Sequence, residues 1–311
     1  MLTEMAEEHR PSRAQKFIQF PLVSAIIALM LVAGAVIVVQ LVMKPLGRYL
    51  FARDDLPMLW LIMMWMLAML TASLAYYTHV RFIERRPMKE LAWSGALSEL
   101  GIGCSIGAGL IISVIVILWI FGYYHVIAVS GAAFVVFPFF NFVFTAVFEE
   151  LVFRGIIFRI IEKSLGSWLA IILSGLLFGF AHVFEPNANL FSSLAISLMG
   201  GVFFSAAYIY TRRLWIVIGI HFAWNFVEGG ILGLAISGKN GKGLLQSEIT
   251  GSEFISGGSF GPEASIVTIL IVLLAGLYLL FKAKGKGHFI RPFWRLKSNF
   301  SELHTSGNTN M

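Results

Sequence analysis

The sequence predicts an all-α polytopic membrane protein with about eight transmembrane helices. Its mean hydropathy is +0.82, 58% of its 311 residues are hydrophobic, and only 13% are charged. An ordinary soluble domain contains about 45–50% apolar residues. No polar stretch is long enough to hold a soluble core. We therefore expect one membrane domain at residues 17–282, between an N-terminal tail at 1–16 and a basic C-terminal tail at 283–311.

Each predicted helix rests on a run of about 20 apolar residues, the length that crosses a bilayer. These runs predict spans at 20–43, 57–78, 100–121, 132–163, 167–184, 190–211, 214–236 and 264–281. An even number of spans puts both termini on one side of the membrane. The first span follows a basic stretch, as a signal peptide does, but its apolar run exceeds the usual length of about 7–15 residues, so we expect a retained helix.

The distribution of basic residues predicts the orientation, because Lys and Arg concentrate in cytoplasmic loops. A cytoplasmic N-terminus puts 17 of the 23 Lys and Arg residues on that side and five on the other. The net charge of +6 is thus explained by topology, and we expect no nucleic-acid partner. The glycine-rich stretch Gly101 to Gly109 predicts close helix packing rather than phosphate binding.

A few polar side chains interrupt the apolar spans, where ionisable groups are costly and usually functional. They are Glu149, Glu150 and Arg154 in one span, His182 in the next, and His221 and Asn225 in span 214–236. Glu150 stands four residues before Arg154, a spacing that predicts an ion pair. Glu149 points elsewhere and needs partners from other helices, for which His182 and His221 are the candidates. They reach similar depths only if the helix continues past Arg154.

This set of residues suits hydrolysis of a peptide bond by water. Glu149 accepts the proton of the water, His182 helps to hold it, and His221 and Asn225 donate to the oxyanion. No G-x-S-x-G motif supplies a serine nucleophile. The alternative is a catalytic zinc ion held by Glu149, His182 and His221. We favour water without a metal or other cofactor, because a ligand role for Glu149 leaves as base only Glu150, which Arg154 already engages.

Three stretches resemble the signatures of a known family. EELVFR (149–154), FGFAH (178–182) and HFAWN (221–225) match the EExxxR, FxxxH and HxxxN patterns of the CPBP family of intramembrane proteases, which includes Rce1-type CAAX prenyl endopeptidases and bacteriocin-processing or immunity-linked proteins. The resemblance implies an active site buried in a bundle of eight helices, in a bacterial plasma membrane. Carried over by motif, it implies that Glu149 and His182 activate water and that His221 and Asn225 stabilise the oxyanion. It also implies supporting roles for Glu150, Arg154 and Phe178.

The predicted function is an intramembrane endopeptidase acting on a membrane-associated peptide or protein, of the CAAX type or of the peptide-maturation type. Two alternatives remain open: a non-catalytic membrane protein that binds a peptide or confers immunity, and a proton-coupled transporter. We expect the substrate to arrive from the cytoplasm or sideways from the lipid. The loop Ser256 to Ser265 is interpreted as a re-entry turn, with a lid or substrate contact as the alternative, and Glu263 is interpreted as a helix-start residue. The oligomeric state is not predicted.

Overall fold

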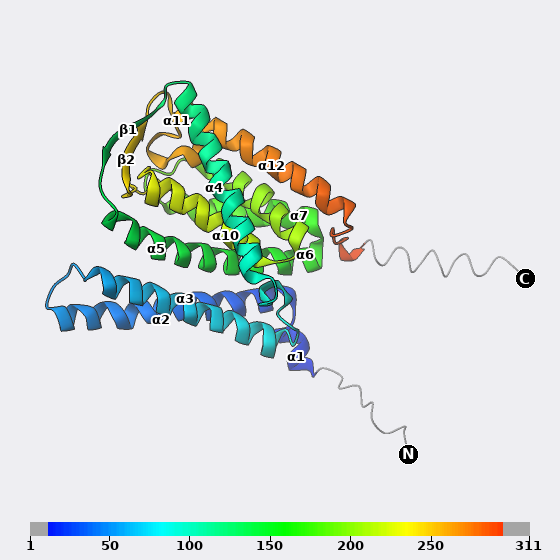
Figure 1. The fold of residues 1–311 in the computed structure, drawn as a ribbon. Coiled ribbons are helices and arrows are strands. Elements are labelled where there is room, and N and C mark those ends of the chain that lie inside the picture. Colours follow the sequence, from blue (N-terminus) through cyan, green and yellow to red (C-terminus); the bar gives the residue numbers. More distant parts are fainter. Residues whose placement is uncertain (1–11, 295–311) are drawn as a thin grey trace, which may run out of the picture.

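The computed structural model describes residues 12–294, and eight of its helices are long and apolar enough to cross a membrane (Figure 1). These candidate spans are Pro21–Phe51, Met58–Ile83, Ala96–Ile120, Ala133–Leu165, Ser167–Phe184, Leu190–Thr211, Leu214–Ile231 and Ile266–Gly285. The predicted multi-pass, helical membrane fold is therefore confirmed.

Several spans are built from more than one helical segment. The α-helices are α1 (Arg13–Ile18), α2 (Pro21–Phe51), α3 (Met58–Thr78), α4 (Ala96–Ile120), α5 (Ala133–Glu150), α6 (Arg159–Leu165), α7 (Ser167–Ala181), α8 (Leu190–Leu198), α9 (Ser205–Thr211), α10 (Leu214–Asn225), α11 (Glu253–Ser256) and α12 (Ile266–Gly285). Wider π-helical turns form η1 (His79–Ile83), η3 (Leu151–Phe158), η5 (Met199–Phe204) and η6 (Phe226–Ile231). Such turns occur frequently at functional sites.

The helices form two layers of unequal size. α2 and α3 pack as a pair, and α3 contacts α5 of the larger group (Figure 1). Within that group α4 lies along α10, and α12 lies along α9 and η5. The predicted role of the glycine-rich stretch in close packing is borne out, because a Cβ on Gly103 would lie 2.3 Å from the carbonyl oxygen of Ile216 and one on Gly107 would lie 2.2 Å from that of Ile220.

A small β-sheet lies at one end of the bundle, and the sequence analysis did not predict it. Strands β1 (Tyr124–Val129) and β2 (Leu245–Ile249) pair antiparallel, with an irregularity between Val126 and Ala128. The sheet lies at the end opposite α1 and the end of α12 (Figure 1). Together with α11 it covers the end of the bundle where the loops after α7 and α10 emerge.

The helix bounds differ from the predicted spans at several ends. α2 runs to Phe51, so Lys44 and Arg48 belong to the helix. The second span continues through η1 to Ile83, and the seventh ends at Ile231 rather than at 236. The last helix covers Ile266–Gly285, so the predicted domain boundary at 282 falls inside α12. Most of the predicted tails, residues 1–11 and 295–311, lie outside the described residues.

An ion-pair network ties the loop after η1 to α6. It lies at the end of the bundle opposite the sheet; this end carries Arg86 and Arg159 and is called the basic end below. The Glu84 carboxylate accepts from Arg86 Nε and from Arg159 Nη2, each at 2.6 Å. Arg86 also donates to Glu90, at 2.8 and 2.6 Å. Burial alone raises the pKa of Glu84, but the His79 ring, whose Nε2 lies 3.8 Å from Glu84 Oε1, and the positive charges of Arg159 and Arg86 outweigh it and lower the pKa to about 2.

Candidate active site

Glu149 lies in the middle of a continuous helix, as its predicted role requires. α5, η3 and α6 form one candidate span from Ala133 to Leu165, so the helix continues well past Arg154. Asn141 and Thr145 precede Glu149 at intervals of four residues, and all three line the same cavity. This spacing places them on one face of the helix. The face is a polar stripe in an otherwise apolar span.

Glu150, the residue after Glu149, accepts hydrogen bonds from two side chains. Its Oε1 accepts from Arg154 Nη1 at 2.9 Å and from His221 Nδ1 at 2.9 Å. Glu150 is fully buried, and Arg154 and His221 are 1% and 5% exposed. The predicted Glu150–Arg154 ion pair is present. The contact with His221 was not predicted, and it leaves Nε2 as the free nitrogen of that ring.

Arg154 is enclosed by aromatic rings and one backbone carbonyl. Its guanidinium carbon lies 4.8 Å from the ring centre of Phe178 and 5.0 Å from that of Phe204. Its Nη2 donates to the Gly200 carbonyl oxygen at 2.7 Å. A buried guanidinium is tolerated only where charge and hydrogen bonds compensate for lost hydration. Phe178, predicted as a supporting residue, therefore touches the buried cation.

His182 ends α7 with its ring orientation fixed. Its Nδ1 lies 2.8 Å from the Phe178 carbonyl oxygen, and its ring lies 4.7 Å from the Phe178 ring. A carbonyl oxygen only accepts hydrogen bonds, so Nδ1 carries the proton and donates. In the neutral ring, Nε2 is then an acceptor, which suits a group that binds a water proton.

One cavity gathers all four residues predicted to be catalytic. Its volume is about 80 Å³, and its walls include Glu149, His182, His221 and Asn225. A buried water molecule needs roughly 10–15 Å³ of cavity volume, so this cavity has space for several water molecules. The three motifs, which lie on three different helices, therefore meet at one site.

The polar atoms of this cavity are available for chemistry. His221 Nε2 lies 3.8 Å from Glu149 Oε2. Within residues 12–294, neither the Glu149 carboxylate nor the Asn225 amide has a hydrogen-bond partner in the protein. Both groups line the cavity and neither is fully enclosed by protein atoms. A carboxylate, an imidazole and an amide thus face space that water can occupy.

The zinc alternative requires three side chains arranged around one point. Among the described residues there is no group of three or more His, Cys, Asp or Glu side chains that could hold a metal ion. His221 Nδ1 is occupied by Glu150, and Glu149 lies 3.8 Å from the remaining nitrogen. Each ligand atom lies about 2.0–2.2 Å from a zinc ion, so two ligand atoms of one ion lie roughly 3–4 Å apart, and the 3.8 Å separation is compatible with a shared ion. As they stand, Glu149, His182 and His221 are not gathered closely enough as a set of three, so zinc binding would require the side chains to move, and the zinc alternative stays open.

The outer wall of the cavity comes from loops at the sheet end of the bundle. It contains Glu185, Ser237, Lys239 and Glu263, and Lys239 Nζ pairs with Glu185 at 2.8 Å. No residue that lines the cavity comes from the basic end. In the predicted orientation the sheet end is extracytoplasmic. The expectation of access from the cytoplasm is therefore not favoured by this geometry.

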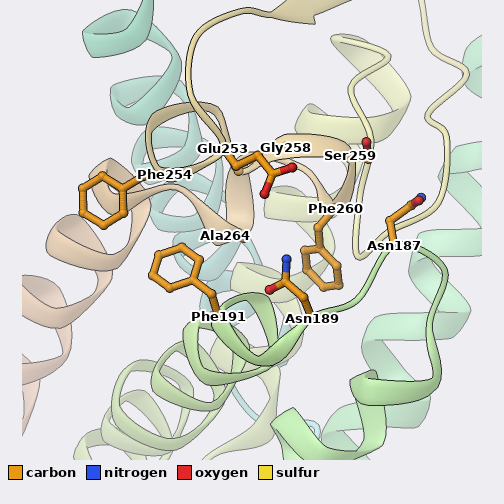
Figure 2. A pocket seen from close by; sticks show the side chains of 10 residues that line it. Asn187, Asn189, Phe191, Glu253, Phe254, Gly258, Ser259, Phe260 and Ala264 are labelled. Atoms are coloured by element: carbon orange, nitrogen blue, oxygen red, sulfur yellow. The ribbon is translucent and has the colours of Figure 1, made fainter.

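A larger pocket of about 370 Å³ lies beside this wall (Figure 2). Figure 2 shows Phe191 and Phe254 on one side of it and Asn187 and Ser259 on the other. Asn187 Nδ2 donates to the Gly238 carbonyl oxygen at 2.9 Å, which links the pocket to the loop that forms the cavity wall. No histidine lines this pocket, so the smaller cavity is the candidate active site.

Sequence reasoning missed several polar residues around the cavity. Asn141 and Thr145 were detectable from their spacing of four residues before Glu149. Glu228 was detectable as a carboxylate inside the predicted span 214–236; it is fully buried, and neither of its oxygens has a hydrogen-bond partner in the described part of the chain. Glu263 was interpreted as a helix-start residue. It does lie in the short turn just before α12, but its carboxyl group also binds Ser237 and lines the cavity, which that interpretation did not foresee.

The fold and this cavity define a multi-pass integral membrane protein with a polar site enclosed by its helices. Residues 131–227 match the family model described as Type II CAAX prenyl endopeptidase Rce1-like. The match spans all three motifs and confirms the resemblance to CPBP family proteases over that segment, which is less than half of the chain. At the family level it supports a CAAX-type intramembrane protease. Comparisons with curated proteins and with solved structures found no match.

Proposed function

We propose that this protein is an intramembrane endopeptidase that hydrolyses a peptide bond with a water molecule activated by Glu149. The observation that carries the proposal is the cavity shared by Glu149, His182, His221 and Asn225. Glu149 has free carboxylate oxygens there, and the fixed orientation of His182 leaves Nε2 to accept a hydrogen bond. These are the parts that a hydrolytic water needs.

The reaction follows from the roles of these groups. Glu149 takes a proton from water while the water oxygen attacks the carbonyl carbon of the peptide bond, with His182 Nε2 accepting the second water proton as a hydrogen bond. The carbonyl oxygen becomes an oxyanion, to which Asn225 Nδ2 donates. Glu149 then passes its proton to the nitrogen of the leaving amine as the carbon–nitrogen bond breaks.

His221 assists the oxyanion only when its ring carries two protons. Nδ1–H is donated to Glu150, so a neutral ring presents an unprotonated Nε2. The carboxylates of Glu149 and Glu150 carry two negative charges, whereas Arg154 supplies one positive charge. A protonated His221 balances this cluster and turns Nε2–H into a donor. Glu150 is therefore the residue that orients His221 and stabilises its charge.

The position of the cavity favours substrates of the peptide-maturation type. The loops that line its outer wall lie at the sheet end, which is extracytoplasmic in the predicted orientation. A prenylated CAAX peptide sits in the cytoplasmic leaflet, at the far end of the bundle. We therefore expect a membrane-anchored peptide whose scissile bond reaches the cavity from the extracytoplasmic side. A transporter is less well supported, because the lining residues do not continue to the basic end.

The test is cleavage by purified protein in lipid nanodiscs. Three probes are used: a farnesylated CAAX peptide, the same peptide without its prenyl group, and a transmembrane peptide with an extracytoplasmic extension. We expect cleavage of the third probe, detected by mass spectrometry, and loss of cleavage with Glu149→Ala. Intact cleavage in that variant would remove the catalytic assignment. Failure to cleave any probe, combined with peptide binding, would favour the non-catalytic alternative.

Metal removal tests the mechanism separately. We expect cleavage to resist a strong chelator and the active protein to contain zinc well below one equivalent. Complete loss on chelation, restored by added zinc, would overturn the water mechanism without a metal and favour the alternative zinc site.

A further inference from the structure

Glu263 belongs to neither the three motifs nor the segment that matches the family model, yet it forms part of the active-site cavity. It lies in the short turn η8 (Pro262–Ala264), just before α12, and is 3% exposed. Its side chain lines the cavity that holds Glu149 and Asn225. A buried carboxyl group beside a reactive site requires a physical explanation.

The hydrogen bonds of Glu263 distinguish its two oxygens. Oε2 accepts from the backbone N–H of Ser237 at 2.7 Å and from the Ser237 hydroxyl at 2.7 Å. Within the described residues Oε1 has no partner in the protein, and it is not a fully enclosed atom. An oxygen that accepts two hydrogen bonds is a poor place for a proton. A proton on this carboxyl group therefore sits on Oε1 and faces the cavity.

The local backbone is shaped to make this contact. Ser237 has φ of 45° and Gly238 has φ of 81°, both in the left-handed region. A Cβ on Gly238 would lie within van der Waals overlap of the Pro186 carbonyl oxygen, and a Cβ on Gly261 would lie 2.3 Å from the Ala235 carbonyl oxygen. The loop after α10 and the loop before α12 thus meet closely, and Ser237 turns both of its donors toward Glu263.

Electrostatics favours the protonated form. Burial raises the pKa of Glu263 above its ordinary value, while the bonds from Ser237 and the nearby rings of His182 and His221 lower it in part. Glu149 on α5, Glu228 on η6, and the Glu185–Lys239 pair at the cavity mouth are the other titratable groups around it. Three of these groups, Glu149, Glu185 and Glu228, are carboxyl groups, and any of them that is ionised disfavours a further negative charge on Glu263.

We infer that Glu263 acts as a neutral carboxylic acid whose Oε1–H donates a hydrogen bond to the carbonyl oxygen of the scissile peptide bond, beside Asn225. The proton stays on Glu263 throughout, and the hydrogen bond strengthens as the oxyanion forms. A carboxyl group kept neutral in an apolar site is a known kind of oxyanion donor. This inference rests on the proposed function, because it adds a donor to the same reaction.

The kinetic test compares a variant that keeps a donor with one that loses it. Glu263→Gln retains N–H donors at every pH, whereas Glu263→Ala has none. We expect kcat to fall about 10²–10³-fold in Glu263→Ala and to be largely kept in Glu263→Gln. The wild type loses kcat at alkaline pH as Glu263 ionises, and Glu263→Gln lacks that loss. Glu248→Gln, an exposed carboxyl group on β2, is the matched control and behaves as the wild type.

A spectroscopic test needs no substrate. The infrared difference spectrum of wild type minus Glu263→Gln is expected to show the band of a protonated carboxyl group at neutral pH. Ser237→Ala removes one donor to Oε2, so the band persists to higher pH. Absence of the band overturns the inference, as does wild-type kcat in Glu263→Ala. If the wild type cleaves no probe the proposed function fails as well, whereas full cleavage by Glu263→Ala removes only the role of Glu263.

Discussion

Glu150 connects two residues that the sequence places on different helices. It accepts hydrogen bonds from Arg154 on η3 and from His221 on α10, and all three side chains are buried. Removing one member of a buried charged set leaves the others without compensation, which costs more than the set contributes in stability. The Glu150–Arg154 pair is therefore important for both folding and the orientation of His221.

Arg154→Met tests this account by its effect on stability. The substitution leaves Glu150 buried with only His221, so we expect the free energy of unfolding to fall by about 3–5 kcal/mol. Thermal unfolding in nanodiscs measures the loss. The double variant Glu150→Gln with Arg154→Met removes both charges and should lose less. A single variant as stable as the wild type would contradict the proposed charge compensation.

The sequence predicted part of this residue chemistry. The spacing of four residues predicted the Glu150–Arg154 pair, because both partners lie on one helix. It did not predict that Glu150 also binds His221, because a contact between helices depends on how they rotate against one another. The contact of Glu263 with Ser237 was missed for the same reason, because it depends on how two loops meet, which no local pattern encodes.

At the scale of helices, contact between α4 and α10 sets the position of His221 and Asn225. Gly107 allows α4 to approach the Ile220 carbonyl oxygen, whereas nothing lies within 4 Å of the corresponding position at Gly109. The two glycines stand two residues apart on one helix. They therefore provide a matched pair of substitutions.

Gly107→Ala is expected to push α10 away and to destabilise the protein by about 1–3 kcal/mol, with reduced cleavage. Gly109→Ala meets no neighbour and gains helix propensity, so its stability should equal or slightly exceed that of the wild type. Thermal unfolding and the cleavage assay are measured on both variants. Equal behaviour of the two would argue against close packing of α4 on α10.

The ion pair between Glu84, in the loop after η1, and Arg159 of α6 predicts a pH dependence. Glu84 has a pKa of about 2 in the folded protein against an ordinary value of 4.5. A carboxyl group with a lowered pKa stabilises the fold fully above its unfolded value, and this stabilisation is lost as pH falls through the folded value. We expect the unfolding temperature to drop between about pH 4.5 and 2, and the drop to be smaller in Glu84→Gln. An identical profile in both proteins would show that Glu84 is not the group responsible.

At the element scale the sequence predicted the helices far better than the small sheet of β1 and β2. Apolar runs of about 20 residues are a strong signal because the bilayer demands them. The strands β1 and β2 are short and are separated by more than a hundred residues, so their pairing leaves little trace in local composition. The π-helical turns likewise follow from tertiary packing and not from a recognisable motif.

For the whole molecule, orientation decides which substrates can reach the cavity. Lys242 lies in the loop at the sheet end, and Lys284 lies in α12 at the basic end, and both are exposed. Lys242→Cys in a Cys104→Ala background should react with a membrane-impermeant maleimide applied to intact cells. Lys284→Cys should react only after the membrane is opened. The reverse pattern would place the cavity mouth in the cytoplasm and restore the CAAX type of substrate.

The eight spans follow from composition, and the meeting of the three motifs follows from their depth along those spans. Glu149, His182 and His221 were expected at similar depths if the helix continued past Arg154, and it does so to Leu165. The direction in which the cavity opens could not be read in the same way. It depends on the loops after α7 and α10, and on residues such as Ser237 and Lys239 that fold back over the site.

The most direct test of the central claim is the rate of peptide cleavage by Glu149→Gln relative to the wild type. Gln keeps the shape of the side chain but cannot take a proton from water, so we predict a fall in kcat of about 10³-fold or more with an unchanged fold. A rate within a few-fold of the wild type would contradict the claim that Glu149 activates the water in this cavity.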